Sequence, residues 1–396
     1  MFKKILISDI VVSISASSFS IFTYWYIYVV SSEQKNIALL GVGQLLGVFF
    51  SIFGGALIDK YNKVNYMRYI VILKILLLLL LLSMGNTIGY INILPIYMFF
   101  SALLGSLYSP ILETIIPCIS ENDEQLYKMN TINASFGQFG GILAVFISAL
   151  YVYIYNIDII IYMTLIFNIF GLALLYGIKI VDRIEGVKNS VIQNIKNGFV
   201  YVFKTRYIIK LLPVALIMNL TYWTIFFLLP KISIEEFHFF KLSYNIFELF
   251  FGIGGILGGL IFYKFVIKIK NMFFIFIAGL IGQSIMLIFM GISLSKISTT
   301  ILILIYVLWA FYAIFNTIVS IVYFSNVQKN IPRDILGSVI GTIFMLFSLI
   351  NPIAAALTPF VISYLTIWKV VVLSGGIMLM SVFVILIIKD IRKAFN

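Results

Sequence analysis

Long apolar runs alternate with short charged or turn-rich breaks along this chain of 396 residues. A helix needs about 20 apolar residues to cross a bilayer. On that basis the runs predict twelve membrane-spanning helices, at residues 5–30, 37–58, 67–84, 93–116, 131–154, 159–181, 207–230, 242–263, 272–292, 299–324, 336–365 and 370–388. The eleventh run is longer than a bilayer requires, so we expect part of it to be a loop or a tilted helix.

Composition agrees with this pattern. Hydrophobic residues make up 62% of the chain and charged residues only 11%, which is more apolar surface than a soluble domain can bury. We therefore predict an all-α integral membrane protein whose main partner is the lipid bilayer. The net charge of +12 is therefore better explained by basic residues that flank membrane spans and set their orientation than by a nucleic-acid-binding surface.

The lysines and arginines are distributed unevenly between the two sides. With the N-terminus inside, the inner segments hold 21 of them and the outer segments five. Because basic residues concentrate in cytoplasmic loops, both termini are predicted to be cytoplasmic, in a multi-pass protein of the cell membrane. Apolar residues reach Val30 without a convincing cleavage site, so the first run is interpreted as an uncleaved span.

The longest polar break lies halfway along the chain and divides it into three parts. Residues 1–181 are expected to form an N-terminal six-helix bundle, 182–206 a cytoplasmic linker and 207–396 a C-terminal six-helix bundle. Within the linker, Val191, Ile195, Phe199 and Val202 recur at helical spacing, and Ser190 offers an N-cap. We expect an amphipathic helix on the membrane surface, with Gln193, Asn194 and Lys196 on its polar face; the alternative is a helix that binds a partner.

The break after the second run carries the most specific motif. It reads Gly54-Gly55-Ala56-Leu57-Ile58-Asp59-Lys60-Tyr61-Asn62-Lys63. Small residues allow two helices to approach closely, and a carboxylate beside cations at a helix end can form a breakable lock. Gly55, Asp59, Lys60 and Lys63 are therefore predicted to form a conformational lock.

This segment resembles the loop between the second and third helices of the major facilitator superfamily, with the pattern G-x-x-x-D-[RK]-x-x-[RK]. The resemblance implies a transporter with two pseudo-symmetric six-helix bundles. A degenerate second copy supports it: Gly258 and Gly259 precede Tyr263 and Lys264, so a tyrosine stands where the first copy has an acid.

Two further stretches are similar to the macrolide-efflux branch of this superfamily. Pro110, Glu113 and Pro117 precede an acidic loop, followed by Asn133 and Gln138; residues 328–334 read Gln-Lys-Asn-Ile-Pro-Arg-Asp. The chain departs from the proton-coupled exporters in two ways. Leu112 and Glu113 occupy the place of an arginine in the fourth span, and the glycines of the fifth span lack the proline of the antiporter signature.

Charged residues inside spans are costly and so are candidates for function. Asp9, Glu113 and Glu248 are candidate proton-coupling residues. For Asp9 and Glu113 the alternative is hydration near the interface, and for Glu248 it is pairing with a polar group on a neighbouring helix. Lys74, in the third span, is expected to extend its long stem to the cytoplasmic interface.

Polar and aromatic residues of spans one, seven and ten are expected to line a central cavity if the superfamily arrangement holds. The candidates for substrate contact are Ser17, Tyr24, Asn219, Tyr222, Trp309, Tyr312 and Asn316. Trp25 and Trp223 lie near span ends, where interface anchoring is the commoner role. Gln44 and Asn351-Pro352 are expected to line or bend helices. Aromatic walls with few polar groups suit a bulky amphipathic ligand.

Several chemistries lack their motifs. No G-x-x-x-x-G-K-[ST] phosphate loop, H-E-x-x-H motif or nucleophile elbow occurs. The single histidine, His238, and the single cysteine, Cys118, predict neither a metal site nor a disulfide. We therefore expect no enzyme and no cofactor.

The leading hypothesis is a monomeric secondary exporter that couples outward movement of a hydrophobic or amphipathic small molecule, such as a macrolide, to protons. One alternative keeps the fold but moves an endogenous metabolite such as a siderophore or peptide, or imports a nutrient. A further alternative is a membrane enzyme or sensor that does not transport.

Overall fold

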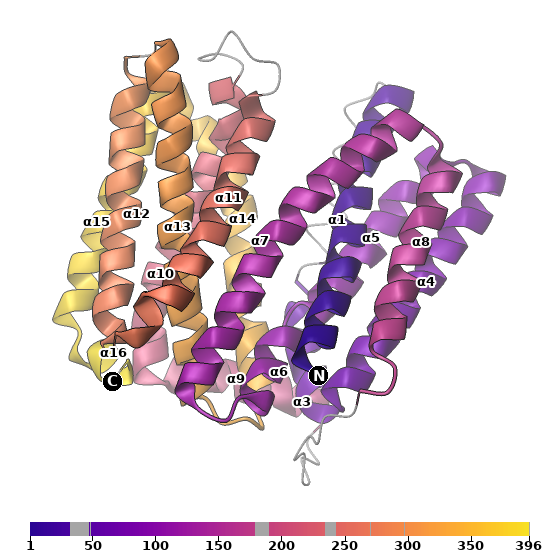
Figure 1. The fold of residues 1–396 in the computed structure, drawn as a ribbon, viewed down its shortest axis with the longest axis horizontal. Helices are drawn as coiled ribbons and strands as arrows, with labels where there is room; N and C mark the ends of the chain where they lie inside the picture. Colours follow the sequence, from indigo (N-terminus) through magenta and orange to yellow (C-terminus); the bar gives the residue numbers. More distant parts are fainter. Residues whose placement is uncertain are drawn as a thin grey trace. The chain divides into compact units, whose positions relative to one another are not determined.

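A computed structural model describes residues 1–31, 47, 49–178, 190–233, 243–269, 271–296 and 298–395. Its regular elements are helices throughout this part of the chain (Figure 1). Eleven helical segments among the described residues are long and apolar enough to cross a membrane. Half of the predicted second span, 37–58, lies outside the described residues, and so does Gln44. The all-helical, multi-spanning prediction is confirmed.

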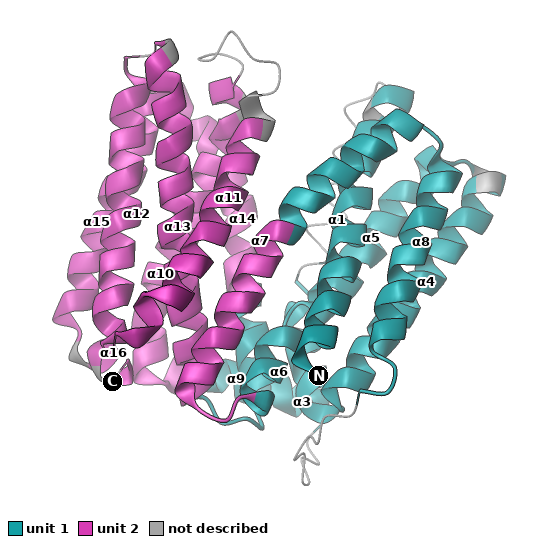
Figure 2. Ribbon diagram, viewed as in Figure 1, with its two compact units in different colours: residues 1–119, 140–201, 331–345 teal, residues 120–139, 202–330, 346–396 magenta. Residues whose placement is uncertain are grey.

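The chain forms two compact units, which Figure 2 colours separately. Unit 1 comprises residues 1–119, 140–201 and 331–345; unit 2 comprises 120–139, 202–330 and 346–396. Two segments thus belong to a different unit from the six-helix bundle to which their position in the sequence assigned them. The start of the predicted fifth span belongs to unit 2, and the start of the eleventh belongs to unit 1.

Among the described residues, unit 1 contains six whole helices and parts of three others. They are α1 (Phe2–Ser31), α3 (Ser51–Lys60), α4 (Lys63–Ile88), α5 (Tyr90–Tyr108), α6 (Ile111–Ile119), the later part of α7 (Asp123–Ile154), α8 (Ile157–Leu174) and most of α9 (Val191–Lys204), with the first turns of α14 (Leu336–Tyr364). Helix α1 packs on α8, and α4 packs on α5 and α8. The apolar core of unit 1 contains Phe19, Phe22, Leu94, Tyr151 and Ile160.

Polar side chains join α1 to α8 inside that core. The Ser8 hydroxyl donates to the Gly171 carbonyl at 2.7 Å, and the Asn168 amide donates to Ser15 Oγ at 2.8 Å. Helices in a membrane gain little from hydrophobicity alone, because lipid is equally apolar. Small residues and interhelical hydrogen bonds therefore hold this pair together.

Unit 2 contains the first part of α7 and the remaining long helices. These are α10 (Arg206–Lys231), α11 (Ser243–Lys264), α12 (Met272–Leu294), α13 (Thr299–Asn330), most of α14, α15 (Ile367–Ile387) and the short α16 (Lys389–Ala394), with the 3-10 turn η2 (Val266–Lys268). Helix α13 packs on both α11 and α12, and α12 also packs on α15. Helix α13 is thus central to the unit.

Local sequence explains several helix limits. Asn62, Asn156 and Asn271 each accept a backbone N–H three residues on, and so cap α4, α8 and α12. The predicted fourth span is divided between α5 and α6 at Ser109-Pro110, because proline has no N–H to continue the helical ladder. The predicted eleventh span is continuous as α14 despite Pro352 and Pro359; a loop within it is therefore excluded.

Helix α9 presents a different face from the one expected. The predicted N-cap is confirmed, since the Ser190 hydroxyl accepts the Gln193 N–H at 3.2 Å. Asn194, which the apolar pattern placed on the polar face, is 2% exposed. Its amide donates to the Ala56 carbonyl of α3 at 3.3 Å. A specific hydrogen bond to a neighbouring helix thus overrides the apolar periodicity, while Ile192 and Phe199 are exposed.

Candidate functional site

The Asp59 carboxylate, at the end of α3, binds the first turn of α14. It accepts the backbone N–H groups of Gly337 and Ser338, each at 2.7 Å, and the Ser338 hydroxyl as well. These N–H groups have no partner within their own helix, and the helix dipole adds positive potential at the same place. Asp59 is only 4% exposed. The contact is therefore a charged acceptor held at a helix N-terminus.

Glycines allow this approach. A Cβ at Gly55 would lie 2.0 Å from the Gly337 carbonyl oxygen, and one at Gly341 would lie 2.8 Å from the Ser51 carbonyl oxygen. Both obstacles are backbone atoms, which cannot rotate away. Helices α3 and α14 therefore cross at a distance that only glycine permits, as the small-residue motif predicted.

The hydrogen-bond donors to the carboxylate are backbone N–H groups and a hydroxyl, and of the predicted lysines Lys63 acts on it through its charge. Lys60 is exposed and lies over the Tyr61 ring at 5.6 Å, whereas Lys63 is buried and attracts Asp59 electrostatically. Asp59 follows the predicted second span. Burial raises the pKa of its carboxyl to about 6, and hydrogen bonds from Ser338 and Gly337, with the charge of Lys63, oppose that rise.

A related contact in unit 2 joins α11 to α7. A Cβ at Gly255 would lie 2.5 Å from Gln138 Cγ, and one at Gly259 would lie 1.8 Å from Ser135 Oγ. Lys128 Nζ lies 5.3 Å from the centroid of the Tyr263 ring, within range of a cation–π attraction. The second, degenerate copy of the motif, at residues 258–264, thus keeps glycines at a close helix contact. The ring of its tyrosine, Tyr263, interacts with the Lys128 ammonium of the neighbouring helix α7.

Asp9 and Lys74 face each other within unit 1. The carboxylate of Asp9, half-buried on α1, attracts the Lys74 ammonium of α4 and lies beside Tyr108 of α5. Lys74 Nζ is 4.6 Å from the centroid of the Tyr108 ring. Lys74 is 9% exposed, so the expectation that it extends to the interface is wrong. A carboxylate and an aromatic face stabilise its charge inside the unit.

The other two predicted acids lie in different surroundings. Glu113, half-buried in the first turn of α6, is repelled by the charge of Asp9, so both acids belong to one charged cluster in unit 1. Glu248 is half-buried on α11, and among the described residues it has no hydrogen bond or ion pair. Within that part of the chain, no group of three or more His, Cys, Asp or Glu could hold a metal ion.

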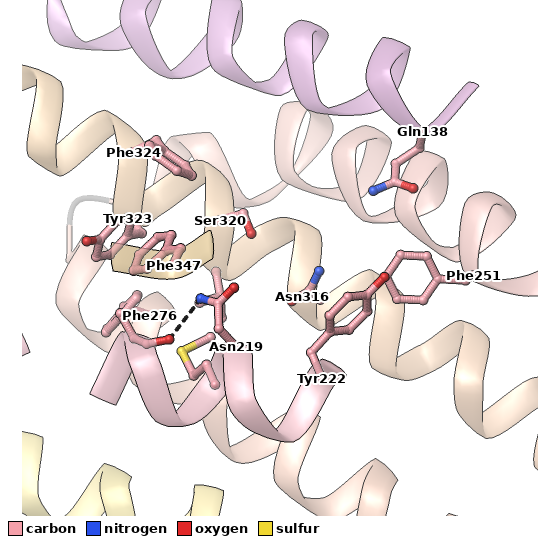
Figure 3. A pocket seen from close by; sticks show the side chains of 13 residues that line it. Gln138, Asn219, Tyr222, Phe251, Phe276, Asn316, Ser320, Tyr323, Phe324 and Phe347 are labelled. Atoms are coloured by element: carbon pink, nitrogen blue, oxygen red, sulfur yellow. Dashed lines mark hydrogen bonds between the residues drawn. The ribbon is translucent and has the colours of Figure 1, made fainter. Parts of the chain in front are cut away.

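An aromatic cavity of about 300 Å³ lies within unit 2 (Figure 3). Its rings come from α10, α11, α12, α13 and α14, and they are Tyr222, Phe251, Phe276, Tyr323, Phe324 and Phe347. Four polar side chains also line it: Gln138, Asn219, Asn316 and Ser320. A mainly apolar wall with a few polar groups is characteristic of small-molecule sites.

The structure brings some of the predicted cavity residues to this site. Asn219, Tyr222 and Asn316 line it. Trp309 and Tyr312 are each 1% exposed and lie behind the wall. The Trp309 ring stacks on Tyr312 at 4.9 Å and on Tyr222 at 6.5 Å, so it supports the wall.

The remaining aromatic and polar candidates lie elsewhere. In unit 1, Ser17 is exposed, while Tyr24 and Trp25 pack against the apolar core. Trp223 packs edge-on against Tyr222 at 5.3 Å. Asn351 lies within α14 and does not line the cavity.

Sequence reasoning missed more than half of the lining. Ser320 and Tyr323 follow Asn316 at spacings of four and seven, so they share its helix face, and extending the face of α13 would have found them. Gln138 is an amide in an apolar run, a visible signal. The phenylalanines of the cavity carry no such signal, because the chain contains 37 phenylalanines and nothing in the sequence distinguishes those that line the cavity.

Comparison with known proteins agrees with this architecture. The family model of the Major Facilitator Superfamily matches residues 5–355. The chain therefore belongs to the Major Facilitator Superfamily, and it is a multi-pass transmembrane transporter. The resemblance of the Asp59 segment is thereby confirmed.

Individual relatives are distant. The macrolide efflux protein A of Streptococcus pyogenes is 22% identical over 384 residues, which cover 93% of this chain and 91% of that protein. Among solved structures, the E. coli fucose:proton symporter aligns with a TM-score of 0.77 at 13% identity, covering 99% and 98% of the two chains. The human organic anion transporter TETRAN aligns with a TM-score of 0.71 at 12% identity, covering 97% and 99%. The solved structures support the fold.

Proposed function

We propose that this transporter exports hydrophobic or amphipathic small molecules from the cell in exchange for protons, by alternating access. The observation that carries this proposal is the aromatic cavity of unit 2, with its few amide and hydroxyl groups. The similarity to a macrolide efflux protein over nearly the whole chain supports outward transport of macrolide-like compounds. In this proposal the protein is a monomer of the plasma membrane with both termini in the cytoplasm.

Proton coupling is assigned to the acids inside the spans. Asp9 and Glu113 repel each other, and Lys74 attracts Asp9, so a proton arriving on one acid changes the balance of charge for the others. Glu248 lies in the same unit as the cavity. A proton moving down about 100 mV releases about 2.3 kcal/mol, sufficient for a concentration ratio of tens.

The lock is assigned to the α3–α14 contact. Asp59 and Gly55 hold the first turn of α14, and Lys128 with Tyr263 joins α7 to α11. Each pair connects segments that chain order assigns to opposite six-helix halves. Opening of the cytoplasmic side would require both contacts to separate, and their re-formation would close it.

A smaller cargo is the second candidate. The cavity is at the low end of the range for small-molecule sites, which favours an endogenous metabolite, or an imported nutrient, over a whole macrolide. Deleting the gene and profiling the medium distinguishes these: loss of a secreted compound with unchanged drug sensitivity favours export of a metabolite. A nutrient importer would instead deplete its cargo from the medium more slowly after deletion.

The direct test is drug accumulation in a host lacking its own exporters. Cells that express the protein should retain less labelled macrolide than cells that do not, and a protonophore should abolish the difference. Asp9→Asn, Glu113→Gln and Glu248→Gln, tested singly at equal expression, should identify the coupling acid. Export that persists unchanged with the protonophore would exclude proton coupling.

A further inference from the structure

Unit 1 has a cavity of about 350 Å³ at the place where α4 packs on α8 (Figure 1). Its described lining residues belong to the early turns of α4 and to the chain just beyond α8, and they are Asn65, Arg68, Tyr69, Ile72, Tyr176 and Gly177. Helix α4 begins at Lys63 and α8 ends at Leu174, so the cavity lies at the ends of two membrane spans. Because spans end where the hydrocarbon meets the polar headgroups, this cavity is at headgroup depth.

The Arg68 guanidinium is held in place beside this cavity. Its Nε and Nη2 donate to the Leu175 carbonyl at 3.2 and 2.6 Å, Nη2 also donates to the Ile178 carbonyl at 2.8 Å, and Nη1 donates to Asn65 Oδ1 at 2.7 Å. The chain turns at Gly177, whose φ of +77° suits glycine. A planar fork of donors matches a phosphate group, and a fork already fixed by carbonyls loses little further freedom when it binds one.

Hydrogen-bond donors remain after these contacts. A guanidinium has five N–H groups, and the contacts above use four of those of Arg68, so the second N–H of Nη1 has no partner among the described residues. The Asn65 side chain uses its oxygen to accept from Arg68, and within the same part of the chain its NH₂ group donates to nothing. None of the described lining residues is acidic. A positively charged wall with unused donors favours the oxygens of an anion.

The rest of the lining suits a lipid molecule. Tyr69 and Tyr176 are 65% and 81% exposed, and tyrosine is enriched at the membrane interface because its ring is apolar and its hydroxyl is polar. Ile72 is also exposed, and it lies one helical turn deeper in the span than Arg68. The polar end of the cavity thus continues into an apolar surface, in the same order as the phosphate and the tails of a phospholipid.

From these observations we propose that the α4–α8 cavity binds the phosphate group of an anionic membrane phospholipid. The phosphate oxygens would accept from Arg68 and Asn65, and the tails would lie along Ile72. A headgroup with net negative charge is favoured because the described lining offers no acid to receive an amine. In the orientation proposed above, this end of α4 lies in the cytoplasmic leaflet, where anionic lipids attract basic residues. The site is independent of the cargo and of the coupling ion.

Photo-crosslinking to the purified full-length protein in a nonionic detergent tests this proposal. The probe is phosphatidylglycerol with a diazirine next to its glycerol, and it should label peptides that contain Tyr69 or Tyr176. Unlabelled phosphatidylglycerol should compete at least about tenfold better than phosphatidylcholine, which has no net charge, since charged hydrogen bonds of this kind are worth a factor of about ten or more. Glycerol phosphate carries the same phosphate without tails. If it competed as well as phosphatidylglycerol, the ligand would be a soluble phosphoester and the lipid assignment would fail.

A matched pair of variants assigns the labelling to this cavity. Asn65→Asp keeps the oxygen that accepts from Arg68, so the contacts with the end of α8 remain, but it replaces the free NH₂ group with a negative oxygen. Labelling at the cavity should fall at least about tenfold. Gln193→Glu makes the same amide-to-acid change at an exposed position of α9 and should keep the labelling. The melting temperature without lipid should be the same in both variants, and phosphatidylglycerol should raise it less in Asn65→Asp.

Three results would overturn the assignment: labelling spread evenly over the basic segments, labelling that Asn65→Asp leaves unchanged, and an equal loss in both variants. Each would indicate a general attraction between a basic protein and an acidic lipid. Drug export is measured separately, in cells. Failure of the lipid assignment would therefore leave the exporter proposal standing, and absence of export would leave the lipid site standing.

Discussion

The Asp59 carboxylate accepts two successive backbone N–H groups with its two oxygens. In Asp59→Asn the amide has one oxygen and one NH₂, so one N–H of α14 would face a donor. Charged hydrogen bonds of this kind contribute about 1.5–3 kcal/mol each. We therefore expect transport to fall at least about tenfold at unchanged membrane insertion, as measured by uptake into vesicles. Lys60→Gln, at an exposed position, is the control and should have little effect; normal turnover of Asp59→Asn would remove the lock from the account.

Acidification should strengthen the α3–α14 contact. In that contact the pKa of Asp59 is about 6, and when the side chain is released to water its pKa should return to about 3.9. The closed contact thus binds the proton more tightly, so its population should rise as the pH falls from about 7 to about 4, by up to about a hundredfold. Spin labels on the two helices would report this. Asp59→Asn should lack the dependence, and a population that falls with acidification would contradict the assignment.

The buried Lys74 and the half-buried Asp9 should behave as a coupled pair. Lys74→Met leaves the carboxylate without its cation, and a partly buried charge left without a partner costs about 1–3 kcal/mol. Removing both charges, in Lys74→Met with Asp9→Asn, should restore most of the stability. Thermal unfolding in detergent measures both. A double variant as unstable as the single one would show that the charges do not interact.

At the scale of helices, Gly55 determines how closely α3 and α14 can pack. A Cβ in Gly55→Ala would meet the Gly337 carbonyl oxygen at 2.0 Å, and overpacking of this kind costs about 1–3 kcal/mol. The melting temperature and the transport rate should both fall. Gly376→Ala on α15 is the matched control, because nothing lies within 4 Å of its new Cβ. Equal stability of the two variants would mean that the helices can separate at no cost.

The apolar runs predicted where the helices lie, but they did not predict which side chains of different helices contact each other. Run length sets a span, and this is a local property, so α4, α12 and α15 lie close to their predicted ranges. The faces of helices depend on neighbours that are distant in sequence. Asn194 is buried because it finds the Ala56 carbonyl, and Lys74 is buried because it finds Asp9 and Tyr108.

The candidate site could likewise be predicted only where its residues form a short local motif or stand out as polar in an apolar run. The Asp59 motif was recognisable because its spacing is short, and the polar residues Asn219 and Asn316 stood out in apolar runs. That Asp59 would bind backbone N–H groups of residues 337 and 338, some 280 positions away, has no signature at position 59. The phenylalanines of the cavity lie in apolar runs, as do exposed ones such as Phe274 and Phe311 on the same helices.

At the scale of the whole molecule, the two units exchange short segments relative to chain order. Residues 331–345 pack with unit 1, and residues 120–139 pack with unit 2. Segment 331–345 is held by close glycines and by the Asp59 carboxylate. Segment 120–139 is held by close glycines, by Lys128 over the Tyr263 ring, by the Lys329–Asp123 ion pair at 2.6 Å, and by hydrogen bonds that the Asn130 amide donates to Ser325 and Gln328. Because such contacts are small, they can break and re-form during a transport cycle, as alternating access requires.

Uptake by purified protein in lipid vesicles with an acidic lumen tests the central claim, that protons leaving the lumen drive the cargo in. With a gradient of two pH units and one proton per molecule, a neutral macrolactone glycoside should accumulate up to about a hundredfold. The accumulation should collapse on addition of a protonophore and should be absent from protein-free vesicles. Equal labelling of vesicles with and without the gradient, for the glycoside and its aglycone alike, would contradict a proton-driven exporter.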